Sequence, residues 1–386
     1  METVDLVALH MVVGGEALAR ESSGRVVFVS GAIAGETVRA ELTAAKKDFA
    51  RATVTEVLVA SPDRVTPACE AWHRGCGGCD WQHIEPAAQL AHKTAIVTEA
   101  LSRTARLADP VVVAAGSVEP WGYRTTVRLA HSACGLGFRS RHSHAVVPIA
   151  ECPVADSAVN AALAAMGTVA GSSGDVTIRV STATGATNTS GSDADIEQDI
   201  EQHIEEDVAG RRLRVSIDSF FQSSPQAADL LVAAVGRALA DVDLPNARVI
   251  DAYGGIGLFA ATAAAAAGEV VVVEGSTSAC ADARHNLSGR NATVIHGRVE
   301  AWEPTAADVV IADPARAGLD RDAVAVLVAT GAPRIVLVSC DTGSLARDTK
   351  LLVASGYQHR STEVIDAFPN TSHIETVTRF DQVVAG

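Results

Sequence analysis

The first sixty residues alternate short apolar runs with polar positions and turn signals. Four runs rich in β-branched residues are separated by turns, most of which contain glycine: VDLVALHMV, GRVVFVSG, ETVRAELTAA and ARATVTEVLVAS. Alternation with a period of two is typical of strands buried on one face, and nothing here reads as a helix. The pattern predicts four or five short strands that form a small β-barrel over residues 1–60.

From residue 216 onwards, apolar strand-like runs alternate with helix-like segments. Five runs are each followed by a helical stretch (VIDAY, EVVVVEG, ATVIHG, DVVIADP and RIVLVSC), and STEVIDAF and HIETVTRF close the chain with a short link between them. Repeated strand–helix units build sheets with helices on both faces. We therefore predict an α/β doubly wound domain over residues 216–386, with an antiparallel last pair and ligands at the carboxyl edge of its sheet.

Residues 61–215 form a third region, with β-rich runs and one helical stretch from Pro86 to Leu107. Within it, residues 181–209 are rich in Ser, Thr, Gly and acid, and the part DADIEQDIEQHIEEDVAG contains no Lys or Arg. Such a composition buries too little apolar surface to order a chain. We expect a small central domain that carries a disordered acidic insert at 181–209.

Composition narrows the class of protein. The formal net charge of −15 disfavours a bulk electrostatic attraction to nucleic acid, although the insert holds much of the acid. Arg124, Arg128, Arg139 and Arg141 form either a phosphate-contacting face or an ordinary solvated one. No charge-free apolar run reaches the roughly 20 residues that span a bilayer, and the acidic start lacks a signal peptide's basic region. We expect a cytoplasmic protein, without a membrane partner, whose seven cysteines form no disulfides.

Polar and glycine residues mark the ends of the predicted strands of the last domain. In DAYGGIGLFA, Gly255 and Gly257 allow a close backbone approach to a ligand at a helix start, but GGxG is not the dinucleotide fingerprint GxGxxG. Glu274 ends the next strand, where an acid can bind ribose hydroxyls. Asp313 ends the fourth strand, either as a helix cap or as a pocket residue.

Cys340 ends the fifth strand of this domain, in SCDTGSLARD. A free cysteine is often simply a small buried residue. A nucleophilic thiol needs partial exposure and a partner that handles protons, and Glu375 at the start of the last strand, with His373 beside it, is a candidate partner. The pattern leaves both interpretations open.

Four other cysteines suggest a separate centre. Cys69, Cys76 and Cys79 follow the spacing C-x₆-C-x₂-C in a glycine-rich loop, and Cys152 lies far downstream. Thiolates converge in this way on a metal or a cluster, and the triplet with a distant fourth favours iron–sulfur over zinc, which more often uses two close pairs. Cysteines without a ligand remain the third interpretation.

Taken together, these motifs resemble the class I, S-adenosylmethionine-dependent RNA uracil-C5 methyltransferases, the 5-methyluridine synthases of rRNA and tRNA. The similarity runs along almost the whole chain: GGEALAR and GETV in a TRAM-type barrel, CGGC with WQH, FFQ, DAYGGIG, VVEG, DPARAG, SCD with LARD, and FPNTSHIETV. The chain departs from the family pattern at four positions, where Gly254, Ala315, Asp341 and Asn370 stand in place of Cys, Pro, Asn and His.

The resemblance implies roles for individual residues. Cys340 would be the nucleophile and Glu375 the base, without a catalytic metal. The pocket for S-adenosylmethionine and the target base would be lined by Gln222, Tyr253, Gly255, Gly257, Glu274 and Asp313. A [4Fe–4S] cluster would be held by Cys69, Cys76, Cys79 and Cys152. Asp341 is expected to raise the pKa of the adjacent thiol, because it adds negative charge.

The resemblance also implies a substrate. We expect methylation of a specific uridine in RNA, with 23S rRNA favoured because the barrel and the cysteines resemble the rRNA branch, and with tRNA as the alternative. A protein that binds RNA or assists ribosome assembly without catalysis is the alternative from another class. Amino-group methylation is disfavoured, because DPAR lacks the Asn and the aromatic of the usual motif. We expect a monomer.

Overall fold

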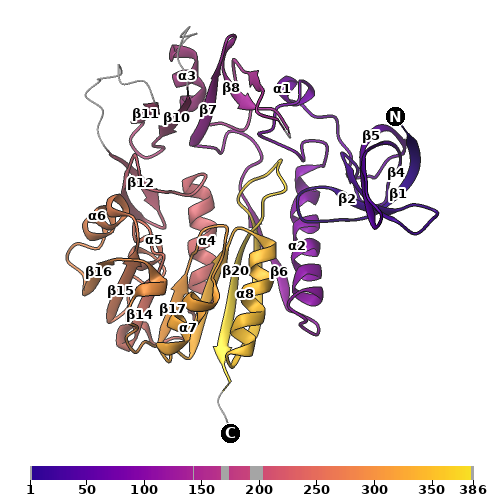
Figure 1. Ribbon diagram of the computed structural model, residues 1–386. Coiled ribbons are helices and arrows are strands. Elements are labelled where there is room, and N and C mark those ends of the chain that lie inside the picture. The colour runs from indigo at the N-terminus through magenta and orange to yellow at the C-terminus, as the bar shows by residue number, and fades with distance from the viewer. Residues whose placement is uncertain (1, 142, 167–173, 192–202, 384–386) are drawn as a thin grey trace.

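A computed structural model describes residues 2–141, 143–166, 174–191 and 203–383. The chain forms three parts: an N-terminal closed barrel, a five-stranded sheet from the middle of the chain, and a large mixed sheet covered by helices (Figure 1). No helix among the described residues combines the length and the apolar character needed to cross a membrane.

The barrel closes in the order β1-β2-β3-β5-β4, as the alternating pattern predicts. Its strands are β1 (Thr3–Met11), β2 (Ala17–Arg20), β3 (Val26–Ser30), β4 (Thr37–Ala45) and β5 (Phe49–Val59). The inward positions alternate along each strand and hold small or branched apolar side chains, such as Val27 and Val29 in β3. Closure removes the open sheet edges that five short strands would otherwise expose.

The large sheet has the order β16-β15-β14-β17-β18-β20-β19-β6. Its strands are β14 (Arg248–Ala252), β15 (Glu269–Glu274), β16 (Ala292–His296), β17 (Val309–Ala312), β18 (Arg334–Ser339), β19 (Tyr357–Asp366), β20 (Glu375–Gln382) and β6 (Val112–Ser117). The first five are parallel, and β20 is antiparallel to both β18 and β19. The predicted α/β doubly wound sheet with an antiparallel last pair is confirmed.

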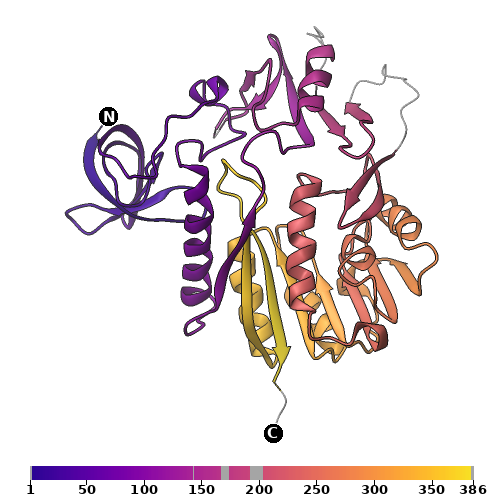
Figure 2. The ribbon, with the colours of Figure 1, turned by 180° about the vertical axis from the view of Figure 1, so that it is seen from behind.

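Helices cover both faces of this sheet, as Figures 1 and 2 show. Their bounds are α2 (Pro86–Arg103), α4 (Pro225–Ala238), α5 (Leu258–Ala261), α6 (Thr277–Asn286), α7 (Arg321–Ala329) and α8 (Thr342–Ala354), with 3₁₀ turns η1 (Leu244–Asn246) and η2 (Val299–Ala301). The strand β16 is followed by η2 instead of the expected helix. Strand order reverses between β14 and β17, which is where a doubly wound sheet opens a crevice for ligands.

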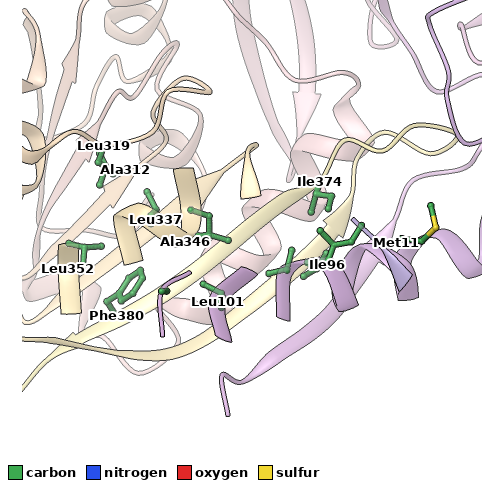
Figure 3. Packing of buried hydrophobic residues seen from close by; sticks show 14 of the residues in the cluster. Met11, Ile96, Leu101, Ala312, Leu319, Leu337, Ala346, Leu352, Ile374 and Phe380 are labelled. Carbon is green, nitrogen blue, oxygen red and sulfur yellow. The ribbon is translucent and has the colours of Figure 1, made fainter. Parts of the chain in front are cut away.

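The edge of the large sheet comes from the middle of the chain. Strand β6 pairs in parallel with β19, with Thr362 opposite Val112, and α2 packs beside it. One hydrophobic core then runs without interruption from Met11 in the barrel through Ile96 and Leu101 in α2 to Leu337 and Phe380 in the sheet (Figure 3). The barrel, α2 and the sheet are therefore held together by a shared core.

The central sheet has the order β11-β10-β7-β8-β9, beside a separate hairpin of β12 and β13. The elements are α1 (Glu70–His73), β7 (Thr126–Ser132), β8 (Gly135–Arg139), β9 (Val146–Pro148), α3 (Ser157–Met166), β10 (Asp175–Val180), β11 (Thr187–Gly191), β12 (His203–Val208) and β13 (Arg211–Ser216).

The expectation of a disordered insert at 181–209 is wrong at its two ends. Residues 187–191 pair with β10, and residues 203–208 pair with β13. In the second pair, Ile204, Glu206 and Val208 alternate along β12 and are buried. The acidic residues between them obscured this strand pattern in the sequence. Residues 192–202, in the middle of this insert, lie outside the described part of the chain.

Candidate active site

The first feature of the carboxyl edge is the turn between β14 and α5. Tyr253 and Gly255 both adopt positive φ angles, 57° and 54°, and Gly257 follows with 80°. Glycine takes this conformation without a steric penalty, which lets the chain reverse within a few residues. Asp251, fully buried at the end of β14, accepts a hydrogen bond from the Ala260 backbone N–H at 3.0 Å and so ties the turn to the helix that follows.

Glu274 joins this turn to the end of β15. One carboxylate oxygen accepts a hydrogen bond from the Gly255 N–H at 2.9 Å, and the other accepts one from the Ser276 N–H at 2.6 Å. Two adjacent loops therefore meet at a single acidic side chain. Tyr253 points to the same edge, where its hydroxyl donates to Glu300 at 2.7 Å.

Two further acids lie at the strand ends. Burial raises the pKa of Asp251 to about 7, with smaller contributions from Asp313 and Glu274, and burial raises the pKa of Asp313 to about 7 as well. Carboxyl groups with such raised values cluster at functional sites more often than elsewhere.

A pocket of about 200 Å³ at the same edge of the sheet contains Cys340. Its walls come from distant parts of the chain: Val13, Gly14, Arg316, Cys340, Asp341, Thr342, Ser372, His373 and Ile374. The pocket lies where the barrel meets the carboxyl edge of the sheet.

Cys340 follows β18 directly and is half-buried. Burial, followed by the Glu375 and Asp313 carboxylates, raises the pKa of its thiol to about 11, and the Arg316 guanidinium opposes this rise. The thiol is therefore protonated in the free protein at neutral pH. A positively charged partner or a proton acceptor is needed before it can act as a nucleophile.

Asp341, beside this cysteine, has a structural task. It is the N-cap of α8, and its side chain accepts a hydrogen bond from the Ser344 N–H at 2.7 Å. An N-cap carboxylate is stabilised by the exposed N–H groups of the first helical turn. The carboxylates that raise the thiol pKa most are Glu375 and Asp313.

Glu375 opens β20 and is 6% exposed. Burial, and secondarily the Asp313 carboxylate, raises its pKa to about 8, while Arg316 and Lys93 oppose the rise. Because Glu375 and Asp313 both raise the thiol pKa, the thiol and the two carboxyls share one electrostatic environment. A carboxyl with a pKa near neutrality can both take up and release a proton under working conditions.

Gln222 and its neighbours lie on the segment between β13 and α4. Gln222 is buried, whereas Phe220, two residues earlier, exposes 74% of its surface. Asp282 in α6 fixes this segment by accepting hydrogen bonds from the Ser216 and Ser219 side chains at 2.7 and 2.6 Å. A large exposed aromatic on an anchored segment is suited to stack on a planar ligand.

The four cysteines of the predicted cluster line one small cavity of about 20 Å³, with Trp72, Gln82 and Arg124 among its other walls. Burial raises the pKa of Cys76 and Cys152, and that of Cys79 to about 12. Among the residues that the structure describes, no three His, Cys, Asp or Glu side chains are placed to hold a single metal ion.

Sequence reasoning missed the contributions of Arg316 and of the barrel to the pocket. Arg316 lies within the DPARAG motif, so its position one turn beyond Asp313 was a usable signal. The approach of Val13 and Gly14 had no local signal, because it depends on how the barrel docks.

Two departures from the family pattern have local explanations. A side chain at Gly254 would bring its Cβ to 2.7 Å from a Val272 methyl, so the turn has no room for one. Asn370 has φ 66°, a conformation that Asn tolerates better than most residues, and its side chain donates to the Pro120 carbonyl at 2.8 Å.

Comparisons with known proteins agree with this architecture. A family model described as tRNA (Uracil-5-)-methyltransferase matches residues 299–382, and a TRAM domain model matches residues 8–55. A Streptomyces avermitilis protein described as an uncharacterized RNA methyltransferase is 34% identical over 97% of this chain and 96% of its own length. A 23S rRNA (uracil(1939)-C(5))-methyltransferase RlmD of Shewanella putrefaciens is 30% identical over 93% of this chain and 91% of its own.

A solved structure shares the fold along the entire chain. The Pyrococcus abyssi tRNA (uracil-54, C5)-methyltransferase in complex with S-adenosyl-L-homocysteine matches with a TM-score of 0.77, covering 98% of this chain and 100% of its own at 22% identity. The resemblance seen in the motifs is confirmed by the Streptomyces and Shewanella relatives, which are 34% and 30% identical over nearly the whole chain. The chain belongs to the S-adenosylmethionine-dependent RNA uracil-C5 methyltransferases.

Proposed function

We propose that this protein methylates C5 of a specific uridine in 23S rRNA in the cytoplasm, through a covalent intermediate on Cys340. One observation carries the proposal: a half-buried thiol shares its electrostatic environment with a buried carboxyl, in a pocket at the carboxyl edge of a methyltransferase sheet. A thiol nucleophile and a carboxylate base are the two groups needed to activate uracil C5, which is a poor nucleophile by itself.

The reaction follows from the chemistry of uracil. The Cys340 thiolate adds to C6, and the electrons of the C5–C6 double bond move towards O4 to form an enolate. C5 of the enolate then takes the methyl group from the sulfonium of S-adenosylmethionine, which leaves as S-adenosylhomocysteine. Glu375 removes the remaining C5 proton, the double bond re-forms, and the sulfur is expelled as thiolate.

Two residues favour the protonation states that these reaction steps require. The Arg316 guanidinium lines the pocket and lowers the pKa of the thiol, which favours the thiolate that attacks. The buried Glu375 has a raised pKa, so its carboxylate is a stronger base than an exposed glutamate. Water excluded by the bound RNA base would strengthen both effects.

For the methyl donor, we propose a site over the turn at the end of β14. Gly255 and Gly257 leave space for the donor, and Glu274 would accept hydrogen bonds from its ribose hydroxyls. Tyr253, Asp313 and Gln222 complete the walls between donor and uracil. Phe220, which is exposed, would stack on an RNA base that has left its helix.

The choice of rRNA rests on relatives. The Shewanella putrefaciens relative is named for uracil 1939 of 23S rRNA, whereas the structural match named for tRNA supports only the fold, because its identity is 22%. Incubation with methyl-labelled donor and unmodified 23S rRNA should place the label on uracil C5, with tRNA transcripts as the comparison. Label in tRNA alone would overturn the choice of substrate, and label in neither would overturn the proposed activity.

We further propose that an iron–sulfur cluster is held by Cys69, Cys76, Cys79 and Cys152. An all-thiolate donor set is the usual one for such clusters, and the four cysteines line one cavity. The cluster would order the segments that carry its ligands, and it takes no part in the methyl transfer.

Protein purified without oxygen should contain about four iron atoms per chain and show the visible absorption of an iron–sulfur cluster. Cys152→Ser should lower the iron content and the thermal midpoint, whereas Cys134→Ser, at an exposed cysteine of the β7–β8 turn, should change neither. Zinc in place of iron in the anaerobic protein would contradict this assignment.

A further inference from the structure

The loop that precedes Glu375 is held by a segment almost three hundred residues earlier in the chain. This base loop, residues 367–374, joins β19 to β20 and lies beside the start of α2 in both ribbon views (Figures 1 and 2). Its last three residues form part of the pocket wall, so its position sets where Glu375 enters the site.

The near end of the loop is anchored by a buried ion pair. Lys93 in α2, fully buried, donates to Asp366 at 2.6 Å and to the Phe368 carbonyl at 3.2 Å. The middle is held at Asn370, whose N–H donates to the Gln89 side chain at 2.6 Å and whose carbonyl accepts from the Trp81 N–H at 3.0 Å.

The far end of the loop, next to Glu375, has one side-chain anchor of a different kind. Asp80 accepts a hydrogen bond from the Ser372 N–H at 2.8 Å, and Ser372 lies three residues before Glu375. Three side chains of this segment anchor the loop, and Asp80 is the one that holds the residue closest in sequence to Glu375.

The barrel contacts the same part of the loop. The Trp81 indole N–H donates to the Gly15 carbonyl at 3.1 Å. Gly15 has φ 83°, and a Cβ there would come within 2.6 Å of the Asp80 carboxylate and 2.9 Å of the Ser372 side chain. Three parts of the chain that are remote in sequence thus meet around the Asp80–Ser372 hydrogen bond.

We propose that Asp80 is a positioning residue for Glu375, acting through its hydrogen bond to Ser372; this inference rests on the proposed role of Glu375 as the base. The bond fixes the last turn of the loop, and with it the carboxylate that takes the C5 proton. A displacement of about 1 Å in a reacting group can cost roughly 10²-fold in rate. The steps before proton removal do not require the Glu375 carboxylate.

The proposal separates two steps that can be measured independently. Asp80→Ala should form the covalent protein–RNA adduct at the wild-type rate but release methylated RNA about 10- to 100-fold more slowly, so that adduct accumulates on ordinary RNA. Asp80→Asn should resemble the wild type, because its amide oxygen can still accept the Ser372 N–H. Rapid quenching and denaturing gels measure both steps.

RNA with 5-fluorouridine at the target measures adduct formation alone, because fluorine cannot be removed from C5 as the proton is. The control is Glu85→Gln, at an exposed acid before α2 whose side chain makes no capping hydrogen bond. The control should match the wild type in both steps. An Asp80→Ala protein that resolves the adduct normally would overturn the proposal, as would one that loses adduct formation on 5-fluorouridine RNA.

Gly15→Ala, a substitution in the barrel, tests the same Asp80–Ser372 hydrogen bond in case Asp80→Ala folds poorly. The added methyl group would push on Asp80 and Ser372, and it would also strain a left-handed backbone, so adduct should again accumulate. Glu375→Gln is run in parallel. If it too fails to accumulate adduct, the proposed mechanism fails; if it accumulates adduct and Asp80→Ala does not, only the role of Asp80 fails.

Discussion

Cys340→Ser is expected to lower methyl transfer by roughly 10⁴-fold or more, which corresponds to at least about 5.4 kcal/mol in activation free energy. A serine hydroxyl is far less acidic than a thiol, and the burial that already raises the thiol pKa to about 11 also disfavours an alkoxide. Without the adduct at C6, C5 stays too electron-poor to attack the sulfonium. Both turnover and the covalent adduct should be lost together.

The measurement is a single-turnover transfer of labelled methyl to RNA, with the adduct followed on a denaturing gel. Serine has nearly the shape of cysteine, so the affinity for RNA and the thermal midpoint should stay close to the wild-type values. Cys134→Ser serves as the matched control, because that cysteine is exposed and outside the pocket. Substantial activity in Cys340→Ser would contradict the covalent mechanism.

Glu375→Gln is expected to stop the reaction one step later. The amide has the shape of the carboxylic acid but does not accept the C5 proton, so turnover should fall by roughly 10²- to 10⁴-fold while methylated adduct accumulates on natural RNA. Adduct formation should be at least as fast as in the wild type at pH 8.5, because the substitution removes a carboxylate that raises the thiol pKa.

The pH dependence of the wild type follows from the same residue. A base must be ionised to accept a proton, and burial raises the pKa of Glu375 to about 8. Only about a tenth of it is ionised at pH 7, so adduct resolution should rise nearly tenfold per pH unit below pH 8 and level off above. Because Glu375 and Asp313 are electrostatically coupled, the observed midpoint belongs to the pair.

This pH profile should vanish from the resolution step of Glu375→Gln and persist in Glu303→Gln, an exposed glutamate in the loop after η2. Rapid-quench measurement of adduct decay between pH 6 and 9 gives both curves. A resolution rate that falls as pH rises from 6 to 8 would contradict a carboxylate base at this position.

The elements of the sheet and the residues at its strand ends could be predicted from sequence because they depend on local signals. Short apolar runs followed by helical patterns define β14, β15, β17 and β18, and the parallel arrangement then brings their carboxyl ends to one edge. The glycine turn, Glu274 and Asp313 are neighbours for that reason alone.

The features that could not be predicted from the sequence depend on how segments remote in sequence pack against one another. The run VVAAGS of β6 looks the same whether it joins a central sheet or the large one, because its partner β19 begins at residue 357. Lys93 and Asp80 carry no local mark of their contacts with the base loop, which are made across the fold. The sequence shows Asp341 as a charged residue beside a thiol. Its role as the N-cap of α8 depends on the orientation of its side chain towards Ser344, which the sequence does not indicate.

The ion pair between Lys93 and Asp366 has a consequence for synthesis of the chain. The partners are 273 residues apart, and both are fully buried in the finished protein. At about 5–20 residues per second, a ribosome needs roughly 14 to 55 s to make the acid after the lysine. During that time α2 and the edge strand β6 have no sheet to join. The nascent barrel can close early, whereas the large sheet is completed last, because β6, its first strand in the chain, pairs with β19, its last but one.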